Sequence, residues 1–160
     1  MNTLGYHYDL VMVRVLDFSY SESKFANGFK PENMLNYDWG FNSHFVVSAE
    51  QEGIFISLDY KLRHPGMEEH FATVVLAAGF KLTNYKDKLD EEGKLIVDPI
   101  FAATLLGVVY STLRGVWHEK FRETSASLFN LPVIDPMTIN FNVEYQESTP
   151  QEPDKKPEQA

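Results

Sequence analysis

The sequence contains no cysteine, so it offers neither disulfide bonds nor thiolate ligands for a metal. Basic residues are also scarce: 14 Lys and Arg stand against 23 Asp and Glu, which gives a formal net charge of −9. Binding to nucleic acid or to an anionic membrane surface requires clustered Lys and Arg, so neither is expected as a partner. The first residues lack a basic segment followed by an apolar run, and a cytoplasmic protein is expected.

Motifs for catalysis and cofactor binding are missing as well. The sequence has no glycine-rich phosphate loop and no Gly-x-Ser-x-Gly, and His118-Glu119 lacks the second histidine of a zinc helix. Residues 87–92 are acidic, but they do not have the ligand spacing of a calcium loop. One turn gathers several potential ligands, which a solvated hairpin tip explains more simply: His64, Glu68, Glu69 and His70. We therefore expect no enzyme, no cofactor and no metal site.

The longest helical pattern covers residues 98–124. Asp98 can cap the first N–H groups, and Pro99 falls at the first helical position, where a missing N–H costs nothing. No side chain is charged from Ile100 to Leu113, and charges then begin at Arg114. This uncharged stretch is too short to cross a membrane, so the pattern predicts a buried helix.

A strip of small side chains recurs every four residues along this helix, at Ala103, Gly107, Ser111 and Gly115. Small residues at this spacing lie on one side of a helix and let another backbone come close. Two interpretations remain open: the strip packs within its own domain, or it forms an interface between subunits.

Four strands are predicted at residues 9–20, 37–49, 54–63 and 70–83. The first has apolar residues at both parities, which suggests cover on both faces. A long crossover loop over residues 21–35 follows it, and short turns then join the rest in an antiparallel meander. The prediction is an α+β domain over residues 1–143, with a four-stranded antiparallel sheet, the long helix, and a short C-terminal helix or segment packed on one face. Residues 144–160, which are acidic and proline-rich, are expected to be a disordered tail.

One helix covers only about one face of such a sheet, yet apolar residues also fill the crossover loop, the start of the second strand and the closing segment. Exposed patches of this kind mark binding surfaces, although these segments can also pack on one another. The candidate binding residues are Phe25, Phe29, Tyr37, Trp39, Phe41, Leu131, Ile134 and Met137.

This order of elements resembles the SecB family of export chaperones over roughly residues 9–141. Tyr110, Arg114 and Gly115 resemble the family's aromatic-x-x-x-Arg segment, and residues 131–136 (LPVIDP) resemble its proline-containing entry to the last helix at similar spacing. Ser111 and Gly115 depart from the residues that flank the helix arginine in familiar members.

The resemblance implies a chaperone that holds unfolded polypeptides in apolar grooves without ATP, for export or for an antitoxin. The candidate binding residues would then contact the client. The resemblance further implies a homotetramer built as a dimer of dimers, with the long helices buried between two eight-stranded layers. Export members engage a SecA-type motor, but no residues here match those that they use for it.

Two other classes of protein remain open. One is a small-ligand-binding domain in which the sheet curls around the helix and encloses an apolar cavity. The other is a small enzyme of the hot-dog type, which would need an acid such as Asp59 or Glu69 near the start of the helix.

Overall fold

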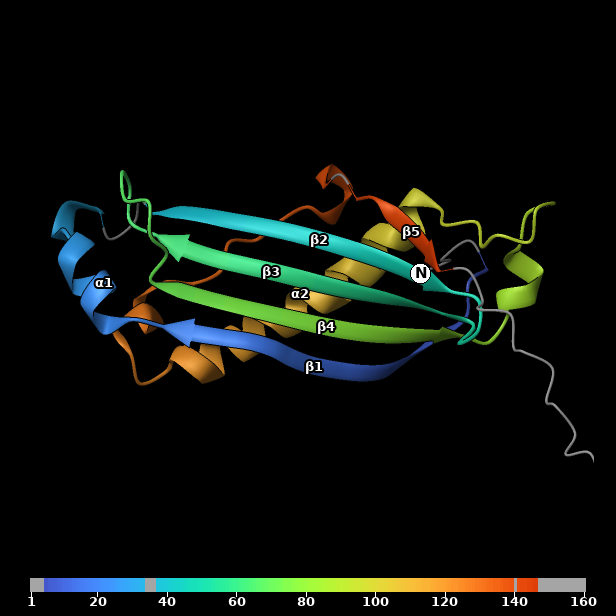
Figure 1. Ribbon diagram of the computed structural model, residues 1–160, viewed down its shortest axis with the longest axis horizontal. Helices are drawn as coiled ribbons and strands as arrows, with labels where there is room; N and C mark the ends of the chain where they lie inside the picture. The colour runs from blue at the N-terminus through green and yellow to red at the C-terminus, as the bar shows by residue number, and fades with distance from the viewer. Residues whose placement is uncertain (1–4, 34–36, 140, 147–160) are drawn as a thin grey trace, which may run out of the picture.

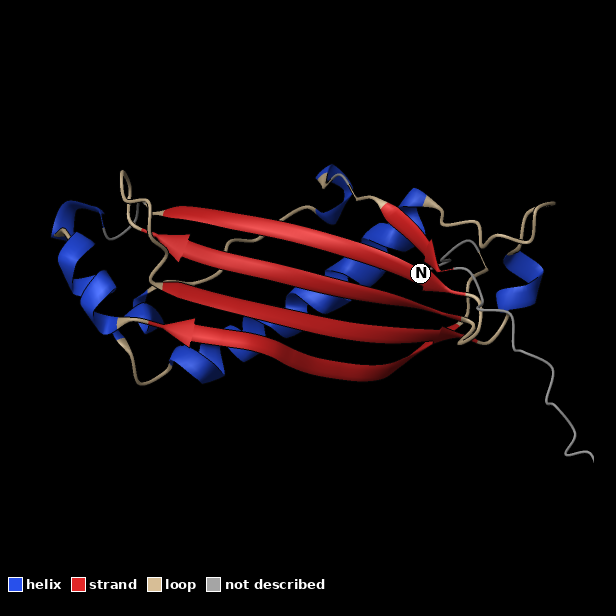
Figure 2. Cartoon of the chain, in the orientation of Figure 1, coloured by secondary structure: helices blue, strands red, loops and turns tan. Residues whose placement is uncertain are grey.

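A computed structural model describes residues 5–33, 37–139 and 141–146. The chain forms two layers, in which a sheet is covered on one face by a long helix and irregular segments (Figure 1). Figure 2 shows helices and strands in one chain, and three strands follow one another without a helix between them in a largely antiparallel sheet, so the predicted α+β class is confirmed.

The sheet has five strands in the order β1-β4-β3-β2-β5. Strands β2 (Asp38–Ser48), β3 (Gly53–Arg63) and β4 (Ala72–Leu82) form the predicted antiparallel meander. The first strand of the chain, β1 (Tyr8–Tyr20), pairs antiparallel with the other side of β4. The prediction of four strands was wrong, because β5 (Val143–Gln146) pairs in parallel with the end of β2. β5 is too short to show a period, and it places Glu144 to Gln146 in the sheet instead of in the expected tail. The rest of that tail lies outside the described residues.

Strand β1 reaches its position through two bulges. Its register against β4 shifts between Leu10 and Met12 and again between Val15 and Asp17. Each bulge inserts one residue and reverses the parity of the residues that follow. Side chains paired with buried residues of β4 therefore stay on the helix side: Tyr8, Leu10, Val13, Val15, Phe18 and Tyr20.

The bulges explain why β1 has apolar residues at both parities. Our prediction that β1 is covered on both faces was wrong, since most of its side chains are exposed. β1 lies at the edge of the sheet and bows outward in the middle (Figure 1).

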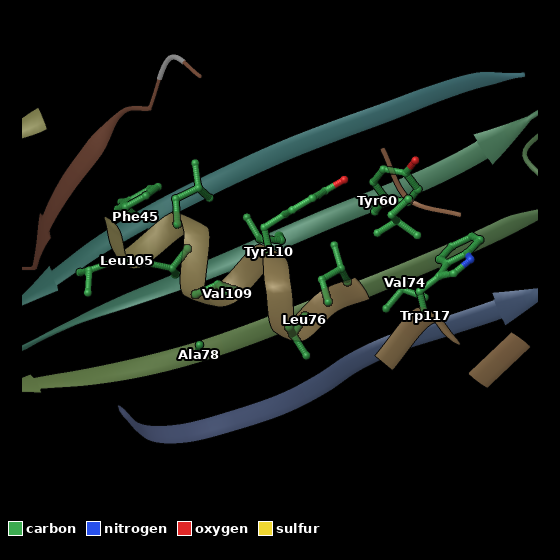
Figure 3. Close-up of a cluster of buried hydrophobic side chains, with 14 of the residues drawn as sticks. Phe45, Tyr60, Val74, Leu76, Ala78, Leu105, Val109, Tyr110 and Trp117 are labelled. Atoms are coloured by element: carbon green, nitrogen blue, oxygen red, sulfur yellow. The ribbon is translucent and has the colours of Figure 1, made fainter. Parts of the chain in front are cut away.

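Helix α2 (Pro99–Phe121) begins as predicted, because Asp98 accepts hydrogen bonds from the backbone N–H groups of Ile100 (2.8 Å) and Phe101 (3.2 Å). It crosses the sheet obliquely (Figure 1). Half of its most apolar window is buried, so α2 is a core helix here, although its length and composition would also suit a membrane span. Figure 3 shows its buried side chains, among them Leu105, Val109 and Trp117, packed on β2, β3 and β4.

The crossover segment contains a short helix, α1 (Glu22–Gly28), and a 3-10 turn, η1 (Pro31–Asn33). Glu22 joins this segment to the turn η3 (Ser125–Leu128), because it accepts hydrogen bonds from the hydroxyls of Tyr20 (2.5 Å) and Ser125 (2.8 Å). These two hydrogen bonds lower the pKa of the Glu22 carboxyl. Further 3-10 turns are η2 (Tyr85–Lys88) and η4 (Pro136–Thr138), and η4 stands where a last helix was considered.

Candidate binding surface

The eight candidate binding residues divide by exposure. Phe25 and Leu131 are buried in the core, so they support the surface without forming it. Phe29, Tyr37, Phe41 and Ile134 are half-buried, and Trp39 and Met137 are exposed.

Phe25 and Phe29 come from the crossover segment, and the others come from the start of β2 and from the chain that follows η3. Trp39 stacks on Tyr60 of β3, with ring centroids 6.1 Å apart and an interplanar angle of 17°. Tyr60 in turn meets the edge of Trp117 at 5.5 Å, while Phe41 meets Tyr110 at 5.7 Å. Aromatic side chains of β2, β3 and α2 thus form one continuous layer at this end of the sheet.

Three of these aromatic groups hold the backbone of residues 129–132, which we call the 129–132 segment. Trp117 donates its indole N–H to the carbonyl of Phe129 at 3.0 Å. Tyr37 donates its hydroxyl to the carbonyl of Asn130, and Tyr110 donates to that of Pro132, both at 2.7 Å.

The 129–132 segment also places alternate side chains in the core. Phe129 is extended (φ −99°, ψ 117°) and packs against Tyr37, Phe71 and Phe25, with ring centroids 4.8, 5.6 and 5.9 Å apart. Leu131 is buried as well, whereas Asn130 between them is exposed. Alternation of this kind is typical of an extended chain bound along one side.

Tyr60 has a fully buried side chain, and its hydroxyl has no hydrogen-bond partner among the described residues. Burial raises its pKa, and the nearby phenols of Tyr37 and Tyr110 raise it further. Burial also raises the pKa of Tyr37, and it raises that of Tyr110 to about 12. All three phenols are therefore neutral hydrogen-bond donors at ordinary pH. In Figure 3 the hydroxyls of Tyr60 and Tyr110 are directed toward the same end of the sheet.

A second apolar surface lies on the helix side of β1. Helix α2 contacts the two ends of this strand, through Phe101 against Tyr8 and through Phe121 against Phe18. Between these contacts Leu10, Val13 and Val15 remain exposed. No strand pairs with the outer edge of β1 within the part of the chain that the structure describes.

The strip of small residues on α2 is partly used within the chain. Ala103 is buried, and a β-carbon at Gly107 would lie 3.6 Å from Cγ of Pro136, so η4 packs over that position. Ser111 is exposed, and Gly115 has open space around it. At Gly107 the strip therefore contacts a side chain of its own chain. An interface between subunits at these residues stays a prediction.

The residues that the alternative hypotheses require are not brought together. Asp59 pairs with Asn42 and Val75 on the face of the sheet opposite α2, and Glu69 makes an exposed ion pair with Lys24 at 3.5 Å. The acid near the start of α2 that a hot-dog enzyme needs is thus not formed by either residue. His64 donates its Nε2–H to the carbonyl of Phe25 at 2.8 Å, and no metal-binding group is found among the described residues.

An enclosed cavity between sheet and helix was the basis of the ligand-binding hypothesis. The described interior is filled there by buried side chains such as Leu58, Leu76 and Leu106. A pocket of about 480 Å³ lies elsewhere, at the rim of the sheet, and is lined by Val47, Ala49, Tyr85, Glu92, Gly93, Lys94, Tyr145 and Gln146.

Sequence reasoning missed the polar part of this surface. Tyr60, Tyr110 and Trp117 follow the apolar pattern of their elements, and nothing in that pattern shows where a hydroxyl or an indole N–H ends.

No protein-family model matches the sequence, and no curated protein matches it. A solved structure that the chain resembles is a SecB-like chaperone of Mycobacterium tuberculosis in complex with an antitoxin peptide. The identity is 13%, the match covers 79% of this chain and 90% of that one, and the TM-score is 0.49. A protein of unknown function from Streptococcus agalactiae matches at 9% identity over 74% of this chain and 90% of its own, with a TM-score of 0.35.

Proposed function

We propose that this protein is an ATP-independent holding chaperone, which binds unfolded or partly folded polypeptides at the aromatic surface around Trp39. The proposal rests on the exposed apolar side chains that surround the aromatic layer of β2, β3 and α2. Trp39 is 47% exposed at the start of β2, Val133 is 85% exposed directly after the 129–132 segment, and Met137 is 56% exposed in η4. Exposed apolar side chains around an ordered aromatic layer are what a surface that binds apolar segments requires.

The remaining properties of the chain support holding over catalysis. The chain has a net charge of −9. Complexes of this chain with an aggregation-prone client would therefore repel one another and stay in solution. The sequence has no motif for nucleotide binding, and a surface that binds apolar side chains needs no chemical step to hold or release them. Binding in such a surface is driven by burial of apolar area, which does not depend on a particular client sequence.

Aggregation of a chemically denatured enzyme, followed by light scattering without nucleotide, tests this function. We expect the chain to delay aggregation near equimolar ratio. Trp39→Ser removes the largest exposed ring of the surface and should weaken the effect several-fold, because full burial of a large apolar side chain contributes about 1.5–3 kcal/mol. Leu128→Ser changes an exposed residue of η3 outside the aromatic layer and serves as the matched control. Equal protection by both variants would contradict the proposal for this surface.

We further propose that β1 is where two copies of the chain assemble. An unpaired edge strand with apolar side chains on its helix side is a ready site for antiparallel pairing with its own copy about a two-fold axis. The exposed Leu10, Val13 and Val15 would be covered in such a dimer. The open positions Ser111 and Gly115 of α2 would serve a second contact, between dimers.

Solution mass tests the assembly. Val13→Lys places a charge in the proposed contact and should yield monomers, because an unpaired buried charge is costly. Val133→Lys is the matched control, since Val133 is more exposed and lies far from β1 in sequence. Gly115→Leu tests the contact on α2 better than Gly107→Leu, which would meet Pro136 of its own chain. Light scattering that gives one mass for all variants would overturn both contacts.

A further inference from the structure

We propose that Tyr37, Tyr60, Tyr110 and Trp117 form a carbonyl-binding cluster for an extended apolar polypeptide, and that the 129–132 segment occupies this cluster when no client is bound. The inference rests on the function proposed above and names how the surface recognises its ligand. Three of the four groups already hold a polypeptide backbone in the free protein, at Phe129, Asn130 and Pro132.

The bound segment has the features that a client segment would need. The hydrogen bonds that it accepts from the cluster use only its backbone carbonyls, which every client carries. The N–H of Phe129 donates to Ala126 of η3 and not to the cluster. Its side-chain contacts come from an aromatic residue and an aliphatic residue two positions later, Phe129 and Leu131, which lie buried on the same side. A foreign segment of the pattern aromatic-x-aliphatic in extended conformation can replace both sets of contacts.

Tyr60 supplies the reason for a client to displace the chain's own segment. Its hydroxyl is fully buried beside Tyr37 and Tyr110, yet it has no partner among the described residues. A buried hydroxyl without a partner is unfavourable, so a ligand that accepts its hydrogen bond gains affinity. The tethered segment does not use this donor, whereas a freely placed peptide can.

The surroundings of the cluster would also allow a client to replace the 129–132 segment. Trp39, half-exposed, stacks on Tyr60 and separates the Tyr60 ring from solvent. The 129–132 segment lies between two fixed points, η3, which Ser125 joins to Glu22, and the contact of Pro136 with Gly107. Release of the Pro136 contact would let the segment leave the cluster without unfolding the sheet.

A disulfide lock tests whether the segment must move. The chain has no cysteine, so Gly107→Cys with Pro136→Cys introduces a single pair. A β-carbon at Gly107 would lie 3.6 Å from Cγ of Pro136, so the two positions face each other between α2 and η4. A small adjustment of η4 would bring the β-carbons to the separation of about 3.5–4.5 Å that a disulfide spans. The probe is a labelled peptide with the sequence of residues 127–135, and its binding to the full chain is followed by fluorescence anisotropy.

We expect the reduced double variant to bind the peptide and the oxidised one to lose binding, with recovery after reduction. Tyr60→Phe should weaken peptide binding about two- to tenfold, the range of one hydrogen bond, without lowering the melting temperature of the free protein. A peptide with Phe129→Ser and Leu131→Ser is the matched control and should not bind. Equal binding by the oxidised and reduced forms, or by Tyr60→Phe and the unchanged chain, would overturn the inference.

The same variants separate this inference from the proposed function. If the oxidised form and Tyr60→Phe both still prevent aggregation of a denatured client as well as the unchanged chain does, the carbonyl-binding cluster is wrong and the chaperone function stands. If the unchanged chain prevents no aggregation but binds the peptide in a manner that depends on the lock and on Tyr60, the cluster stands and the chaperone function is wrong.

Discussion

Replacement of Trp117 by Phe tests the contact that anchors the 129–132 segment. Trp117 is 3% exposed, and its indole N–H is the donor to the buried residue Phe129 at 3.0 Å. Trp117→Phe leaves that carbonyl without its donor and also leaves a small cavity beside Tyr60. A buried unsatisfied group costs about 1–3 kcal/mol, and the lost packing adds roughly 1 kcal/mol, so the free energy of unfolding should fall by about 2–4 kcal/mol.

The chain provides a matched control, because its other tryptophan, Trp39, is about half exposed. Trp39→Phe makes the same chemical change and keeps a ring over Tyr60, so its effect should stay below about 1 kcal/mol. Urea unfolding followed by far-ultraviolet circular dichroism, at one fixed protein concentration, measures both. Equal effects for the two variants would show that the Trp117 hydrogen bond does not hold the segment.

Two further predictions concern the crossover segment. The pKa of Glu22 is lower in the folded chain than in the unfolded one, so its contribution to stability is present above the unfolded value of about 4.3 and is lost as pH falls through the folded value. Glu22→Gln should therefore remove part of the loss of stability that occurs as pH falls below about 4.3, measured by urea titrations at several pH values. Ser125→Ala should reduce that loss less, because the hydrogen bond from Tyr20 remains. The same pH dependence of stability in Glu22→Gln and the unchanged chain would contradict this prediction. Gly28→Ala should cost about 1–3 kcal/mol, because its β-carbon would lie 2.4 Å from Cδ2 of His64, whereas Gly40→Ala meets nothing within 4 Å and should be close to neutral in calorimetry.

Most of the architecture could be predicted from the sequence, because local patterns determine it. Asp98 and Pro99 mark the start of α2, and clean alternation marks β2, β3 and β4. The errors arose where one element depends on another. Val11 and Leu16 stand at the bulges of β1, and only the pairing with β4 reveals that they shift the parity of the strand. Likewise, β5 is defined by its pairing with β2 and not by any period of its own.

The candidate surface could be predicted only in its apolar part. Composition identified Trp39 and Met137 as apolar residues in segments that a single helix cannot cover, and both are exposed. Composition could not show that Phe25 fills the core, because an apolar residue in a loop looks the same whether it is buried or exposed. The donor of Tyr60 was also beyond reach, since an unsatisfied hydroxyl is a property of the folded environment and not of the residue.

The central claim is that this chain holds unfolded polypeptide without nucleotide. Sedimentation of the chain mixed with a permanently unfolded polypeptide, for example one that has been reduced and alkylated, tests this claim most directly. We expect the two to sediment together as a complex, and an added peptide with the sequence of residues 127–135 to release the client. Separate sedimentation of the chain and the unfolded polypeptide at every ratio would contradict it.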